Sequence, residues 1–159
     1  MAGRILPLCH ASAATLAAIH GACFSPGWRE VDFQYLLQDP LYAGFILKEK
    51  NDKILGFIDW YRVGDTGDIY SLCVLPSYRG HGLGRQLLSA LVKAVSQQGD
   101  ACTLFLEVAE GNVIGQHLYI SHGFHLIGQR RCYYSSNNSR GTTALVFSRP
   151  FCEKERIFQ

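Results

Sequence analysis

The 159-residue sequence lacks paired cysteines, long hydrophobic runs and a strong net charge. Its six cysteines, at positions 9, 23, 73, 102, 132 and 152, are never closer than 14 residues, so the C-x-x-C spacing of zinc and redox motifs is absent. No run of about 18 apolar residues occurs, which argues against a membrane-spanning helix. The net charge of +2 argues against a dedicated nucleic-acid binder, because phosphate contacts need a concentrated basic face.

Export and metal signals are also weak. Residues 5–28 contain no Asp, Glu, Lys or Arg, which loosely resembles an export signal, but Pro7 and His10 interrupt the apolar core that such a signal needs. We therefore expect a cytoplasmic protein with reduced thiols. His117 and His122 lie five residues apart, off the i, i+4 spacing of a helical metal pair, so we expect no metal site.

What the chain does have is the composition of a folded protein. Hydrophobic types make up 48% of the residues and charged types 18%, which excludes a disordered chain. A chain of this length corresponds to one domain and buries about two-thirds of its unfolded surface. We expect one domain over residues 1–159, with a core over about residues 3–149.

Hydrophobic periodicity predicts an alternation of strands and helices. We expect helices over residues 12–23, 30–38, 83–98 and 112–122. We expect strands over residues 3–8, 42–47, 54–63, 69–75, 103–108, 124–134 and 143–147. This order, β-α-α-β-β-β-α-β-α-β-β, favours an α/β or α+β fold in which helices cover both faces of a mixed sheet.

The strongest local feature is a glycine-rich segment, residues 79–85, which reads Arg-Gly-His-Gly-Leu-Gly-Arg. It lies between an expected strand and a well-patterned amphipathic helix. Three glycines let main-chain amides approach a ligand closely, and a helix N-terminus adds unpaired N–H groups. Together with the charges of Arg79 and Arg85, these features are typical of a phosphate or pyrophosphate site.

Two nucleotide-binding motifs fail at this segment. A P-loop needs Gly-Lys-Ser/Thr, whereas Gly84 is followed by Arg85 and Gln86. The dinucleotide motif G-x-G-x-x-G would begin at Gly80 and needs glycine at position 85. A glycine-rich turn that binds nothing stays open at this point.

The motifs resemble those of the GNAT superfamily of N-acetyltransferases. That family's pyrophosphate loop, Gln/Arg-x-x-Gly-x-Gly/Ala, is matched by Arg79, Gly82 and Gly84, after a strand that ends in Val-x-Pro. A second family block is matched by Asn112, Leu118, Tyr119, Gly123 and Phe124. The resemblance implies a mostly antiparallel central sheet of about seven strands and acetyl-CoA as cosubstrate, and it covers about residues 3–149.

A narrower resemblance is to the ribosomal-protein-alanine N-acetyltransferases of the RimI type. It rests on Leu106-Glu107-Val108, on Tyr119 twelve residues after Glu107, and on the Arg-Cys-Tyr-Tyr segment of residues 131–134. The sequence departs from that subgroup at Ala109, where an arginine is usual. It also has Gly-Thr-Thr at residues 141–143, where that subgroup usually has the acidic residues expected to recognise a basic peptide.

The resemblance implies a role for each matched residue. Glu107 would be the general base, although a solvent-facing strand residue is the simpler interpretation from sequence alone; partial burial would suit it to accept a proton. Tyr119 would be the general acid, against the alternative of a core aromatic. Acetyl-CoA would contact Leu72, Cys73, Val74, Arg79, Gly80, His81, Gly82, Leu83, Gly84, Arg85 and Asn112. Trp28, Tyr133 and Tyr134 would line the acceptor slot.

Three functions stay open. The first is acetylation of a protein N-terminal α-amine, plausibly that of a ribosomal protein. The second is acetylation of a small-molecule amine or a lysine. The third is a module that binds acetyl-CoA without catalysis, which the presence of both Glu107 and Tyr119 disfavours.

Overall fold

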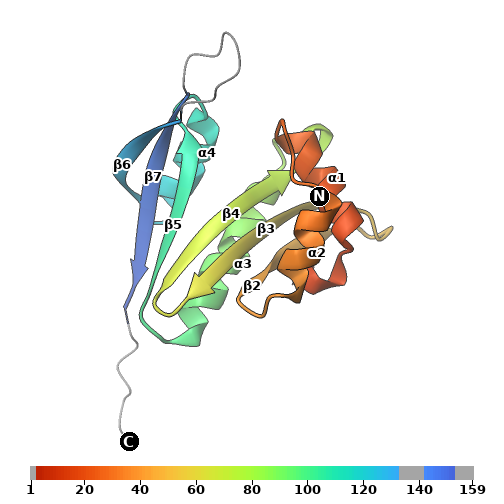
Figure 1. The fold of residues 1–159 in the computed structure, drawn as a ribbon, viewed down its shortest axis with the longest axis horizontal. Coiled ribbons are helices and arrows are strands. Elements are labelled where there is room, and N and C mark those ends of the chain that lie inside the picture. Colours follow the sequence, from red (N-terminus) through yellow and green to blue (C-terminus); the bar gives the residue numbers. More distant parts are fainter. Residues whose placement is uncertain (1–2, 133–141, 153–159) are drawn as a thin grey trace, which may run out of the picture.

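The computed structural model describes residues 3–132 and 142–152, in which helices cover both faces of one central sheet (Figure 1). The strands are β1 (Arg4–Pro7), β2 (Tyr42–Lys48), β3 (Ile54–Val63), β4 (Thr66–Val74), β5 (Cys102–Ala109), β6 (His125–Cys132) and β7 (Thr142–Phe151). The helices are α1 (Ala13–Cys23), α2 (Glu30–Gln38), α3 (Leu83–Gln98) and α4 (Val113–Ser121), with short 3-10 turns η1 (Leu8–His10) and η2 (Pro76–Tyr78).

The sheet contains seven described strands in the order β1-β2-β3-β4-β5-β7-β6. Every neighbouring pair is antiparallel except β4 and β5, which are parallel. The predicted fold class, a mixed and mostly antiparallel sheet with helices on both faces, is confirmed.

Two strand boundaries were predicted wrongly. We expected the last strand to end at residue 147, but β7 continues to Phe151 and includes Pro150, which pairs with Thr103 of β5. On its other side, β7 pairs with β6 only as far as Ser148. Pro150, which has no N–H to donate, therefore interrupts no hydrogen bonds between β6 and β7. We also expected the fourth strand to begin at residue 69, but β4 begins at Thr66 because a tight turn directly precedes it.

Local signals at the helix ends behave as the sequence predicts. The Ser12 hydroxyl accepts a hydrogen bond from the Thr15 amide at 3.1 Å and caps α1. Helix α3 lies between Gly82 and Gly99, both with left-handed φ angles, and it buries its predicted apolar stripe. Gly123 adopts the left-handed φ of 84° expected directly after α4.

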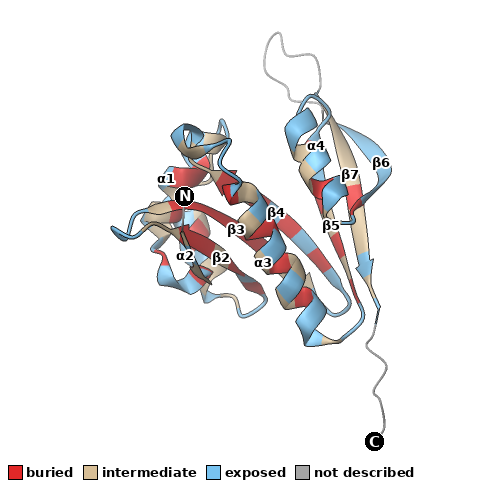
Figure 2. Ribbon diagram, turned by 180° about the vertical axis from the view of Figure 1, so that it is seen from behind, coloured by how far each residue is buried: buried red, intermediate tan, exposed pale blue. Residues whose placement is uncertain are grey.

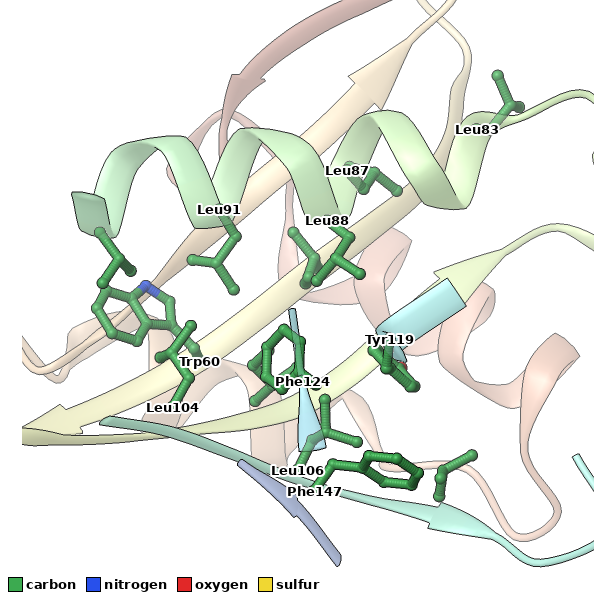
Figure 3. Close-up of a cluster of buried hydrophobic side chains, with 14 of the residues drawn as sticks. Trp60, Leu83, Leu87, Leu88, Leu91, Leu104, Leu106, Tyr119, Phe124 and Phe147 are labelled. Carbon is green, nitrogen blue, oxygen red and sulfur yellow. The ribbon is translucent and has the colours of Figure 1, made fainter. Parts of the chain in front are cut away.

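The core consists of two hydrophobic clusters, one on each face of the sheet (Figure 2). On one face, leucines of α3 pack against Trp60 and Leu104, and Tyr119 and Phe124 extend the same cluster toward α4 (Figure 3). On the other face, α1 and α2 bury Leu16 and Phe33. Each fully buried side chain of this kind contributes about 1.5–3 kcal/mol, so the core holds the sheet rigid beneath the site.

Across the described residues, none of the helices combines the length and the apolar character needed to cross a bilayer.

Candidate active site

The glycine-rich segment forms an open turn at the N-terminus of α3. Gly80 and Gly82 have left-handed φ angles of 81° and 75°, which glycine adopts without strain. A Cβ atom at either position would meet no heavy atom within 4 Å, so this face of the turn is uncovered by the described residues. The first N–H groups of a helix have no partner within it, and those of Leu83 and Gly84 therefore suit an anion.

The charged side chains around this turn do not all point toward an anion. The Arg79 Nε donates to the Val74 carbonyl at 3.1 Å, so Arg79 bends back to the end of β4. The His81 Nδ1 lies 3.0 Å from the Arg79 carbonyl and closes the turn on itself. Arg85 is exposed. Leu83 is 2% exposed, so it offers a ligand its main chain but not its side chain.

Strands β4 and β5 separate soon after they meet (Figure 1). Their parallel register covers only residues 66–68 of β4 and 103–105 of β5. Beyond it, Leu72–Val74 pair only with β3 among the described strands. An extra β4 residue, Tyr70, lies opposite the Asp59–Trp60 step of β3 and forms a bulge. The opening therefore presents the main chain of Leu72–Val74 along one side.

Side chains on this strand alternate between the two core clusters. Leu72 and Val74 pack against the cluster under α3, whereas Cys73 is buried in the cluster under α1 and α2. Cys73 thus offers a ligand at the β4 edge only its main chain. Of the residues predicted to bind acetyl-CoA, the structure brings those of the strand edge and those of the glycine turn to adjoining positions, joined by η2.

A cavity of about 440 Å³ lies between β4 and β5, and Glu107 belongs to its wall together with Asp68, Ile69, Tyr70, Phe105, Leu106 and Val146. Glu107 accepts a hydrogen bond from the Arg130 Nη2 at 2.7 Å. Its side chain is 42% exposed, so it is partly buried and still open to the cavity. Glu107 interrupts an apolar strand because β5 turns this side chain to the open cavity rather than to the core.

Tyr119 lies on α4 inside the core cluster under α3, in edge contact with Phe124 at a centroid distance of 5.9 Å. Burial raises the pKa of Tyr119 to about 12, and the neighbouring Cys73 thiol adds to this rise. The phenol therefore stays protonated at neutral pH and retains a proton to donate. Tyr119 packs as a core aromatic residue, as the alternative interpretation expected. This packing does not prevent its phenol from acting as an acid.

Asn112 caps α4, because its Oδ1 accepts a hydrogen bond from the Gly115 amide at 2.9 Å. A contact between Asn112 and a ligand stays a prediction. Trp28 stacks on His20 at a centroid distance of 4.7 Å and meets Tyr70 edge-on at 5.8 Å. Trp28 thus adjoins a residue of the cavity wall. Tyr133 and Tyr134 lie outside the described residues.

The sequence analysis missed Asp68, Tyr70 and Arg130. Asp68 looked like a turn residue because the strand start was placed too late, and Tyr70 looked like an ordinary strand residue because a bulge has no fixed sequence signature. Arg130 reaches Glu107 from β6, on the far side of β7, and only the strand order brings the two together. Within residues 3–132 and 142–152, no three His, Cys, Asp or Glu side chains gather closely enough to hold a metal ion.

Comparison with known proteins links this geometry to one family. The sequence profile of the acetyltransferase (GNAT) family matches residues 13–124. The [ribosomal protein bS18]-alanine N-acetyltransferase of Escherichia coli strain K12 is 34% identical over 113 residues, which are 71% of this chain and 74% of the enzyme. The crystal structure of the Escherichia coli ribosomal-protein-S18-alanine N-acetyltransferase superposes with a TM-score of 0.84 at 28% identity, covering 99% of both chains.

A more distant structure shares the fold. Arabidopsis thaliana NAA60 in complex with acetyl-CoA superposes with a TM-score of 0.78 at 17% identity, covering 94% of this chain and 98% of that one.

Proposed function

Because this chain belongs to the acetyltransferase (GNAT) family and is an acetyl-CoA-dependent N-acetyltransferase, we propose that its acceptor is the N-terminal α-amine of a protein, of the ribosomal-protein-alanine type. The observation that carries the proposal is the opening between β4 and β5. It places an unpaired strand edge between the glycine turn and the cavity that contains Glu107. The similarity to an enzyme named for this acceptor supports the same choice.

The chain's own residues would bind acetyl-CoA along this path. Main-chain amides of the glycine turn, residues 80–84, would hold the diphosphate at the positive end of α3. The Leu72–Val74 edge would pair with the pantetheine as a neighbouring strand does. A main-chain amide near Val74 would donate to the thioester oxygen and stabilise the negative charge that develops there during acyl transfer.

The choice of an α-amine follows from the cost of deprotonation. An amine must be neutral to attack, and a chain-terminal amine has a pKa near 7.7–8.0, against about 10.4 for lysine. The gap of about 2.5 units corresponds to roughly 3.4 kcal/mol, so a single carboxylate is a more adequate base for an α-amine than for a lysine. The cavity wall contains two carboxylates, Asp68 and Glu107, and we assign Glu107 as this base because its spacing from Tyr119 matches the subgroup that the sequence resembles.

Tyr119 would supply a proton to the departing thiolate. Its raised pKa keeps the phenol protonated, and α4 holds it in the core cluster next to the opening. Trp28, Tyr133 and Tyr134 would contact the acceptor, and Tyr70 joins Trp28 in that role because the two rings touch. The organisation of residues 1–159 as one acetyltransferase domain, the ribosomal protein as partner and a cytoplasmic location stay predictions.

The test is a comparison of acceptors under equal concentrations of acetyl-CoA. One peptide begins with alanine and contains no lysine, a second has the same sequence with a blocked N-terminus and one lysine, and a third acceptor is a small diamine. Mass spectrometry follows the acetylated products. We expect the free N-terminus to react fastest; faster acetylation of the lysine or of the diamine would overturn the proposal.

A further inference from the structure

Two cysteines that are far apart in the sequence lie together beneath the opening. Cys23 is the last residue of α1, and Cys73 lies on β4. Both belong to the core cluster under α1 and α2, where Cys73 is 1% exposed and Cys23 is half-buried. The Cys23 sulfur contacts the carbonyl of Val74, the residue that follows Cys73, and each of the two cysteines shifts the pKa of the other. The sequence gives no hint of this pair, because 50 residues separate its members.

The surroundings of the two thiols differ. The protonated Cys23 thiol donates a hydrogen bond to the Val74 carbonyl at 3.4 Å, and the Arg79 Nε donates to the same carbonyl at 3.1 Å. Hydrogen bonds from Cys73 and from Arg79, together with the positive charge of Arg79, lower the pKa of Cys23 to about 6 against its partial burial. The pKa of Cys73 is raised by its bond to Cys23 and by burial.

This arrangement is that of a reactive thiolate beside a resolving thiol. A cysteine with a low pKa next to a cation is the more readily oxidised, provided that it is accessible. Cys23 meets both conditions, whereas Cys73 is buried and protonated until its neighbour reacts. Cys102 is not accessible in this way, because it is buried in the other core cluster.

We propose that Cys23 and Cys73 form a peroxide-reactive pair that closes into a disulfide between α1 and β4. The Cys23 sulfur attacks one oxygen of hydrogen peroxide; an S–O bond forms, the O–O bond breaks, and the departing hydroxide takes a proton to become water. The Cys73 sulfur then attacks the Cys23 sulfur; the S–S bond forms, the S–O bond breaks, and the second hydroxide takes the Cys73 proton. In total two thiols lose two electrons and two protons, and one peroxide becomes two waters.

Closure would also affect the opening. The two sulfur atoms, which are not bonded in this structure, would come to a bond length of about 2.05 Å, and this would draw β4 toward α1. Cys73 lies between Leu72 and Val74, the edge assigned above to the pantetheine, so the disulfide should lower acetyl transfer. This consequence rests on the proposed function, whereas formation of the disulfide does not.

Mass spectrometry tests the disulfide directly. The reduced full chain is treated with hydrogen peroxide, remaining thiols are blocked with N-ethylmaleimide, and the protein is digested with trypsin. Cleavage after Arg4, Arg29, Arg62 and Arg79 gives peptides 5–29 and 63–79. We expect these two peptides to be joined and two hydrogens lighter than their sum, and separated again by dithiothreitol.

Matched variants identify the partner of Cys73, because peptide 5–29 also contains Cys9. The Cys23→Ser variant should lose the joined peptides, whereas Cys9→Ser should keep them. Recovery of Cys23 blocked by N-ethylmaleimide, or oxidised but unlinked, would overturn the proposal. So would joined peptides that persist in Cys23→Ser.

Turnover measurements on the reduced and the oxidised protein distinguish a failure of the disulfide proposal from a failure of the proposed function. Activity of the reduced wild-type chain reports the acetyl transfer itself. We expect peroxide to remove most of that activity in the wild type, dithiothreitol to restore it, and Cys23→Ser to keep its activity through the same treatment. Equal turnover of the linked and the reduced protein would contradict the effect of closure on the site.

Discussion

Glu107 is the only acidic residue of β5, and it combines an exposed carboxylate with a place in the cavity wall. Its carboxylate forms an ion pair with Arg130 at 2.7 Å. Because the Arg130 side chain is 64% and the Glu107 side chain 42% exposed, solvent weakens this attraction, and an incoming amine can still reach Glu107.

The Glu107→Gln variant removes the proposed base without changing the side-chain volume. We expect kcat to fall by about a hundredfold or more, since general-base catalysis contributes about 10²–10⁴-fold. Acetyl-CoA affinity, measured by calorimetry, should stay close to that of the wild type. Glu110→Gln, just beyond the end of β5, is the matched control and should keep full turnover. Unchanged kcat in Glu107→Gln at every pH would exclude Glu107 as the base.

Tyr119 makes a second test at this scale, because a phenylalanine in its place keeps the edge contact with Phe124 and removes only the proton donor. With the pKa of Tyr119 raised to about 12, its phenol should stay protonated through pH 10, so it should add no loss of activity on the alkaline side. We expect Tyr119→Phe to lower kcat by about a hundredfold while the protein unfolds at nearly the same urea concentration. The exposed Tyr35→Phe serves as control. Wild-type turnover in Tyr119→Phe would remove this residue from the mechanism.

These residues show what the sequence could and could not predict about the site. Glu107 became a candidate because a charge interrupts an apolar strand, and Tyr119 became one because its spacing from Glu107 resembles that of a known subgroup; their catalytic roles stay predictions. The sequence alone favoured a solvent-facing side chain at Glu107, but it did not predict that this side chain opens on a cavity, since the cavity depends on the separation of β4 from β5. Its partner Arg130 comes from a strand that pairs with neither β4 nor β5.

At the scale of elements, the N-terminus of α3 and the edge of β4 form the path that we propose for acetyl-CoA. The helix was predicted to its last residue because the leucine stripe and the flanking glycines agree on its bounds. The separation of the strands was not predicted, because hydrophobic alternation carries no information on where a pairing register stops. The Tyr70 bulge escaped prediction for the same reason.

The glycine turn can be tested by filling it. Gly82→Trp places a large side chain on the uncovered face of the turn, so acetyl-CoA affinity should fall by at least about a hundredfold, which is roughly 2.7 kcal/mol. Gly64→Trp is the matched control, because Gly64 also has a left-handed φ, of 60°, and no heavy atom within 4 Å of its Cβ direction. Both variants carry the same backbone strain, and only the first should lose binding in calorimetry. Equal affinity in the two variants would mean that the turn does not hold the diphosphate.

At the scale of the whole molecule, a buried carboxyl group couples folding to pH. Asp59 of β3 is fully buried and accepts a hydrogen bond from the Tyr42 hydroxyl at 2.5 Å. Burial raises the pKa of Asp59 to about 7, with the hydrogen bonds opposing the rise. Its protonated form is therefore favoured in the folded state, and Asp59 contributes stability that is complete below the unfolded pKa of about 3.9 and is lost as the pH rises toward 7.

Urea unfolding of the wild type and of Asp59→Asn at several pH values measures this coupling. The amide does not titrate, so the difference in unfolding free energy between the two proteins should shift against the wild type as the pH rises from 4 to 8. A pKa difference of about three units corresponds to roughly 4 kcal/mol as an upper bound on that shift. A constant difference between the two proteins would show that Asp59 does not titrate in this range.

The two faces of the sheet pack against different residues of the proposed sites. The cluster under α3 contains Tyr119 and the buried residues of β5. The cluster under α1 and α2 contains Cys73, and Cys23 and Trp28 pack against it. Both clusters meet at β4, so the proposed acetyl-CoA binding, acyl transfer and cysteine oxidation would all take place at or beside the opening between β4 and β5. All three proposals that involve turnover require acetyl-CoA to bind in that opening.

The most direct measurement is a crystal structure of the full chain grown with coenzyme A. The account predicts the diphosphate within hydrogen-bond distance of the main-chain amides of residues 80–84, and the pantetheine paired with Leu72–Val74. Coenzyme A bound elsewhere on the molecule, or a glycine turn closed by side chains in that crystal, would contradict it.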